Sequence, residues 1–172
     1  MGVLSSDAGL VAAGALGGAV GTLAMDLTWY ARYRRAGGPQ GFVDWETAAG
    51  TTSYEGASAP GQVGRKLAAA VLHREPSPSS ARAMTNVVHW STGVQWGVVY
   101  GLAMPVVRRI GPLPAGVGLA AIAFGTSYVV LPLLGVYKPI WEYDPKDVLQ
   151  DATAHLMYGI TGATVTSAVA GR

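Results

Sequence analysis

Four long stretches of this chain contain no charged side chain, and they constrain its fold more than any other feature. They cover residues 8–25, 83–107, 110–137 and 152–171, so each is between 18 and 28 residues long. The hydrocarbon core of a bilayer needs about 20 mostly apolar residues in a helix. A soluble all-helical protein with four such stretches would have too little polar surface, because only 13% of its 172 residues are charged. The sequence therefore predicts an all-α membrane protein.

The predicted fold is a bundle of four transmembrane helices that form a single integral membrane domain, 1–172. The helices are expected at about 9–32, 84–107, 115–137 and 149–170. The connection between the first two, at 33–83, is long for so small a protein. Within it, residues 61–74 place apolar side chains on one helical face, which predicts a short amphipathic helix on the membrane surface.

Glycines recur at four-residue spacing in the predicted helices and indicate close packing between them. Glycine makes up 24 of the 172 residues, about twice its usual share. In membrane helices, small residues four apart let two backbones approach closely. The expected packing residues are Gly14, Gly18, Gly93, Gly97, Gly101 and Gly159. His89 begins one of these stripes, so we expect its side chain to face protein rather than lipid.

The ionisable side chains that enter the predicted helices gather near one side of the membrane. This is the side of the two connections 33–83 and 138–148. Acids and histidines at membrane depth are costly and mark functional sites. Asp151 and His155 are four residues apart, so they share a helix face. The residues interpreted as an ion or proton relay are Asp26, His89, Asp151 and His155.

The same two connections carry aromatic and acidic side chains next to each other. These residues are candidates for a lid over the relay or for a membrane-interface belt: Trp45, Glu46, Trp141 and Glu142. Nine of the twelve Lys and Arg residues lie on this side of the predicted bundle. The excess predicts that this side is cytoplasmic.

Several motifs and residue types are absent from the sequence, and their absence argues against further classes of protein. No phosphate-binding glycine loop, zinc-protease motif or nucleophile elbow is present, which favours a role that is not enzymatic. The absence of cysteine excludes thiolate ligands. The net charge of +2 comes without a basic stripe, so no nucleic-acid partner is expected.

The spacing of a set of residues in the second half of the chain resembles that of a bacterial family. The residues that carry it are His89, Gly97, Tyr100-Gly101, Pro105, Gly116, Pro132, Gly135, Pro139, Trp141, His155 and Tyr158-Gly159. Their pattern resembles the YagU-like bacterial inner-membrane proteins, a family of unknown function. The resemblance implies a small multi-pass protein of the inner (plasma) membrane with a histidine in each of two helices. It also implies that the N-terminal side is inside, opposite to the orientation favoured by the charge count.

Two helices begin alike, which raises the alternative of a repeated structure. His89 and Gly93 are spaced as His155 and Gly159 are, so the chain is consistent with two repeated helical hairpins. In that arrangement the two histidines belong to parallel helices. They could then face each other as ligands of a haem iron or a divalent metal ion.

Three functions remain open at this stage. The first is movement or binding of a proton or small cation through the Asp/His cluster. The second is a haem or divalent-metal site held by His89 and His155. The third is a non-catalytic scaffold or assembly subunit whose glycine faces bind another membrane subunit. Four short helices leave little room for a pore, so we expect a homo-oligomer in the lipid bilayer.

Overall fold

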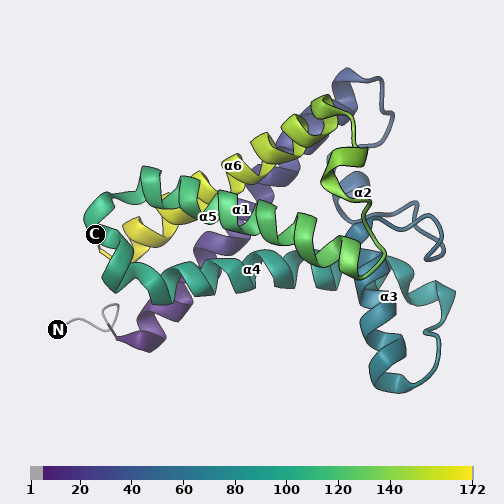
Figure 1. Cartoon of the computed structure of the whole chain (residues 1–172), viewed down its shortest axis with the longest axis horizontal. Coiled ribbons are helices and arrows are strands. Elements are labelled where there is room, and N and C mark those ends of the chain that lie inside the picture. Colours follow the sequence, from purple (N-terminus) through teal and green to yellow (C-terminus); the bar gives the residue numbers. More distant parts are fainter. Residues whose placement is uncertain (1–5, 172) are drawn as a thin grey trace. The chain divides into compact units, whose positions relative to one another are not determined.

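The computed structural model describes residues 6–171, and every regular element in that range is a helix. This confirms the predicted all-helical class. The α-helices are α1 (Asp7–Arg35), α2 (Phe42–Glu46), α3 (Ala59–Leu72), α4 (Ala81–Val107), α5 (Pro112–Leu133) and α6 (Pro145–Val169) (Figure 1). Three short 3-10 helices lie between them, namely η2 (Pro78–Ser80), η3 (Arg108–Ile110) and η4 (Ile140–Glu142).

Two of the helices, α1 and α5, are long and apolar enough to cross a membrane. The two other predicted spans also form long helices, α4 and α6. They do not reach the same hydropathy, because α4 carries histidine, glutamine and asparagine and α6 carries several threonines. Membrane-spanning character by length and composition is thus limited to two helices of the described chain.

Local backbone chemistry explains where the helix ends differ from the prediction. The helix expected from 149 begins at Pro145, because the Asp144 carboxylate caps it by accepting the Lys146 N–H at 2.7 Å. The helix expected to reach 137 ends at Leu133. Gly135 has a left-handed φ of 62°, which turns the chain away from the helix axis.

The chain forms two compact units, each with contributions from distant parts of the sequence. The first comprises residues 6–29, Thr92–Thr126 and 144–171, and we call it the glycine-packed unit. The second comprises Tyr30–Ser91 and Ser127–Tyr143, and we call it the loop unit.

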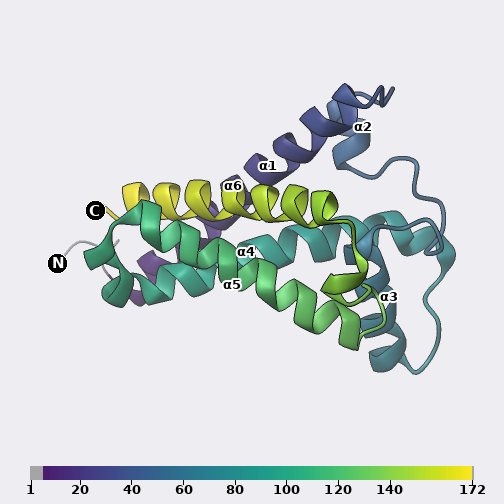
Figure 2. The ribbon, with the colours of Figure 1, turned by 45° about the horizontal axis from the view of Figure 1, so that its top comes forward.

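In the glycine-packed unit the helices meet backbone to backbone (Figure 2). A Cβ atom on Gly18 of α1 would lie 2.5 Å from the carbonyl oxygen of Gly93 in α4. A Cβ atom on Gly116 of α5 would lie 2.7 Å from the carbonyl oxygen of Gly159 in α6. Such approaches leave no room for any side chain. The buried core residues beside these contacts are Leu10, Ala13, Tyr100, Met104, Ala115, Leu119, Tyr158, Ala163 and Ala170.

In the loop unit, aromatic side chains and side-chain hydrogen bonds connect the end of α1, α2 and the first turns of α4. Four rings from the end of α1 and from α2 pack together with centroid separations of 5.2–6.1 Å. They belong to Tyr30, Tyr33, Phe42 and Trp45. The hydroxyl of Tyr30 also donates a hydrogen bond to the Gln40 carbonyl oxygen at 3.1 Å, which closes the turn between these helices.

Candidate functional site

Asp151 and His155 form a polar pair on α6, within the glycine-packed unit. Nδ1 of His155 lies 3.1 Å from Oδ1 of Asp151 and 3.0 Å from the carbonyl oxygen of the same residue. Both side chains are only 14% exposed. The ring of Phe124, on α5, packs edge-on against the imidazole with the centroids 5.5 Å apart. The pair is therefore fixed in orientation and mostly shielded from the surroundings.

This geometry determines which nitrogen of His155 is available for chemistry. Both contacts of Nδ1 are to acceptor oxygens of Asp151, so the favoured tautomer carries its proton on Nδ1 and donates it. The lone pair of the neutral ring is then on Nε2. A carboxylate that orients an imidazole in this way is the usual support of a histidine that accepts a proton or binds a metal ion.

Asp26 is the buried acid of the same unit. It is only 4% exposed and continues, one turn further along α1, the stripe that contains Gly18 and Thr22. Helices α1 and α6 run antiparallel, because Gly17 lies against Gly162 and Gly21 lies against Tyr158. One more turn of this register brings α1 at Asp26 level with the part of α6 that carries His155. Asp26 itself belongs to the stripe of Gly18 and Thr22, which faces α4 at Gly93.

His89 belongs to the loop unit and lies close to an acid from the long connection. A ring nitrogen of His89 and a carboxylate oxygen of Glu46 lie within 4.8 Å of each other. Both residues are partly buried. Imidazole and carboxylate are ligands that divalent cations share, so this pair also has the chemistry of a cation site.

Three residues position Glu46 near His89, and we call them the Thr47 clamp: Thr47, Arg82 and Asn86. The carbonyl oxygen of Thr47 accepts hydrogen bonds from Nε of Arg82 at 2.9 Å and from Nδ2 of Asn86 at 3.0 Å. Both donors are on the first turns of α4, the helix that carries His89. The clamp therefore holds the end of α2, and Glu46 with it, against that part of α4.

The four lid candidates separate into two kinds of environment. Trp45 packs against Tyr33 with the ring centroids 6.0 Å apart, and Glu46 lies beside His89. Trp141 and Glu142 lie on η4, where both are exposed, Trp141 to 81%. Of the four candidates, Glu46 is therefore the one that is placed next to a predicted relay residue.

Sequence reasoning missed the contacts that bring these residues together. No local pattern links Glu46 to His89 or Thr47 to Arg82, because each pair is far apart in the chain and depends on how the long connection folds back. Tyr158 was also overlooked as a polar contact. Its hydroxyl donates a 2.6 Å hydrogen bond to the Gly93 carbonyl oxygen and so links α6 to α4 within the glycine-packed unit.

No family model, curated protein or solved structure matches this chain. The resemblance to the YagU-like proteins therefore stays a prediction.

Proposed function

We propose that the chain is a multi-pass inner-membrane protein whose four long helices, α1, α4, α5 and α6, all cross the bilayer. The distribution of polarity in the glycine-packed unit supports this proposal. On α1, Leu16 is 49% exposed while Thr22 is 2% exposed. On α6, Thr166 and Ser167 are buried. Apolar side chains outside and small polar ones inside suit a lipid surrounding, in which the outer face needs no polar groups.

The function we propose for this protein is to bind, and pass on, a proton or a small cation near one membrane face. The observation that carries the proposal is that each of the two histidines predicted for the relay lies beside a carboxylate. His155 has Asp151 as its partner, and His89 has Glu46. Carboxylate–imidazole pairs at membrane depth are expensive to bury and recur in proton and ion pathways.

Each group has a definite role in this proposal. The Asp151 carboxylate orients the imidazole, and Nε2 of His155 accepts a proton or coordinates the cation. Glu46 provides the corresponding carboxylate for His89. Asp26 adds a buried negative charge within the glycine-packed unit, and such a charge favours a cation in that unit. One bundle of four helices is too narrow to enclose a pore, so in this proposal several copies of the chain form the ion path together.

The scaffold hypothesis has less support, because it needs glycine faces that are free to bind another protein. The stripes of Gly14, Gly18, Gly93, Gly97 and Gly159 all contact helices of the same chain. Their surfaces are therefore occupied by internal packing. No contact in either unit specifically favours haem.

The proposal is tested by flux measurements on purified protein reconstituted in liposomes. A pH-sensitive dye inside the vesicles reports proton movement, and a metal-sensitive dye reports divalent cations. We expect the double variant His89→Gln/His155→Gln to reduce the flux to the level of protein-free vesicles, because glutamine neither titrates nor binds these cations well.

The third histidine provides a matched control. His73 is exposed at the end of α3, outside both pairs, so His73→Gln should leave the flux unchanged. Equal flux in the double variant and in the unmodified protein would overturn the proposed role of the histidines.

A further inference from the structure

The outer face of α3 combines exposed apolar and basic side chains. Leu67 is 54% exposed and Val71 is 76% exposed, and both lie on one side of the helix together with Lys66 and Ala70. Arg74, two residues after the end of the helix, is also exposed. We call this surface the α3 outer face: Lys66, Leu67, Ala70, Val71 and Arg74. In water such an apolar surface would be unfavourable, so its composition indicates a partner.

The opposite face of α3 is fixed within the loop unit, so the direction of the outer face is fixed as well. Gly61 and Gly64 are buried against the first turns of α4, where they meet Thr85 and Met84. A larger residue at either glycine would require side chains of α4 to move, since a Cβ atom there would lie against Thr85 or Met84. The amphipathic helix therefore presents its remaining side outward.

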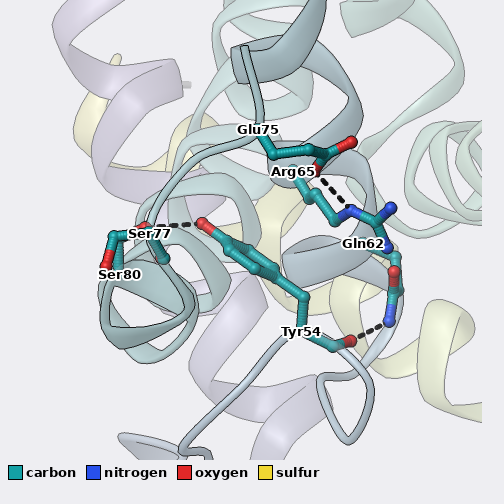
Figure 3. Close-up of polar contacts among 6 residues, drawn as sticks. All are labelled: Tyr54, Gln62, Arg65, Glu75, Ser77 and Ser80. Atoms are coloured by element: carbon teal, nitrogen blue, oxygen red, sulfur yellow. Dashed lines mark hydrogen bonds and ion pairs between the residues drawn. The ribbon is translucent and has the colours of Figure 1, made fainter.

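Polar contacts hold both ends of α3 in place (Figure 3). Before the helix, the carbonyl oxygen of Tyr54 accepts a hydrogen bond from the Gln62 side chain, and the Tyr54 hydroxyl lies 2.7 Å from Oγ of Ser80. After it, Nε of Arg65 lies 2.9 Å from Oε2 of Glu75. These contacts lie at the ends of the helix and on the side away from its outer face, which takes no part in them.

Charge determines which partner fits. Within Ala59–Leu72 there are two basic residues and no acid, and Arg74 adds a third cation. One of the three, Arg65, is already paired with Glu75. Lys66 and Arg74 therefore border the apolar residues with positive charge. Apolar side chains bordered by cations suit the interface of an anionic bilayer, where each cation near the surface adds to binding.

We propose that the α3 outer face docks on the surface of an anionic phospholipid bilayer. Leu67 and Val71 enter the boundary between headgroups and acyl chains, and Lys66 and Arg74 contact the lipid phosphates. This inference rests on the membrane-spanning part of the proposed function, since α3 directly precedes α4. It is independent of whether the histidine pairs bind a cation.

The absence of cysteine makes a direct test simple. In the full-length protein, Val71→Cys carries one environment-sensitive fluorophore, and Gly56→Cys provides a matched exposed site in the loop before α3. Each is reconstituted in phosphatidylcholine liposomes with and without phosphatidylglycerol. We expect the probe at residue 71 to shift to shorter wavelength and resist quenching by iodide when the anionic lipid is present, whereas the probe at residue 56 stays accessible.

Charge variants test the electrostatic part. In the Val71→Cys background, Lys66→Gln and Arg74→Gln should each reduce the docked population about fivefold, as expected for removing one cation from an anionic surface. The control Arg65→Gln/Glu75→Gln removes one charge of each sign from the same segment. It should leave the docked population unchanged.

Three results would count against the inference in different ways. A probe at residue 71 that is quenched equally in both kinds of liposome would overturn it. Protection in neutral liposomes that grows with the protein-to-lipid ratio would instead identify a second copy of this chain as the occupant. Release of the protein from liposomes by an alkaline wash would contradict the membrane-spanning proposal itself.

Discussion

The two units of this molecule are stabilised by opposite means. In the glycine-packed unit the helices pack closely because glycine has no side chain: α1 and α4 meet where Gly14 faces Gly97 and Gly18 faces Gly93. In the loop unit it comes from side chains that are present, such as Arg82 on the Thr47 carbonyl oxygen. The first arrangement is sensitive to added volume, and the second is sensitive to lost hydrogen-bonding groups.

The difference also bears on the two histidine–carboxylate pairs of the proposed function. Close backbone packing gives a rigid support on which Asp151 and His155 keep their geometry. A loop held by a few hydrogen bonds can open at modest cost, so Glu46 can approach or leave His89. Within the proposal, the Asp151–His155 pair is therefore the fixed one and the Glu46–His89 pair is the adjustable one.

The largest effect is expected for added volume in the glycine-packed unit. A Cβ atom on Gly97 would lie 2.5 Å from Cα of Gly18, a backbone atom that cannot rotate away. Overpacking of a well-packed core usually costs about 1–3 kcal/mol, and we expect Gly97→Val to reach or exceed about 3 kcal/mol because backbone must move. Thermal unfolding in mild detergent, followed by circular dichroism, measures the change.

Gly118 on α5 is the matched control, since nothing lies within 4 Å of a Cβ atom built there. Gly118→Val should unfold at the same temperature as the unmodified protein or slightly above it, because valine has a higher helix propensity than glycine. If both variants unfolded alike, the rigid character of the glycine-packed unit would be refuted.

Much of the glycine-packed unit could be predicted from the sequence, and its chemistry explains why. The helices follow from uncharged stretches, and the close contacts follow from glycines four apart, which are both local patterns. The i, i+4 spacing of Asp151 and His155 likewise predicted a shared face, and the 3.1 Å contact between them agrees with it. The start of α6 was predicted four residues too late, at 149 instead of Pro145, because the cap at Asp144 decides that boundary.

The loop unit was much less predictable. The sequence located the amphipathic helix, which the structure places at Ala59–Leu72. It gave no sign of α2, whose five residues show no periodicity, or of the clamp that joins Thr47 to Arg82. These contacts connect residues that are far apart in the chain and depend on single hydrogen bonds, so no repeat or spacing in the sequence predicts them.

An intermediate effect is expected when the Thr47 clamp is weakened. Arg82→Ala removes the hydrogen bonds of the guanidinium to the carbonyl oxygen and to Oγ1 of Thr47, both at 2.9 Å. Because Arg82 is exposed, we expect a local loss of about 1 kcal/mol. Hydrogen exchange at residues 42–47 should accelerate about fivefold, while exchange in α6 stays unchanged.

Arg74→Ala removes an arginine from the same unit without touching the clamp, and exchange at residues 42–47 should not respond to it. If exchange at residues 42–47 were as slow in the Arg82 variant as in the unmodified protein, the aromatic packing of Trp45, rather than the clamp, would be what holds α2 in place.

The smallest effect is expected for the ion pair of Arg65 and Glu75. Its removal shows how little an exposed contact of the loop unit contributes compared with the partly buried ones. Both side chains are well exposed, and such pairs contribute little to folding.

The Glu75 carboxylate raises the pKa of the Arg65 guanidinium. A raised pKa of a basic group stabilises the folded state below its unfolded pKa, and this contribution disappears only as the pH rises through the folded pKa. For arginine that range is far above neutral pH. Arg65→Gln should therefore leave the unfolding temperature unchanged from neutral to mildly alkaline pH in detergent, and a clear decrease would mean that the turn after α3 helps to hold the loop unit together.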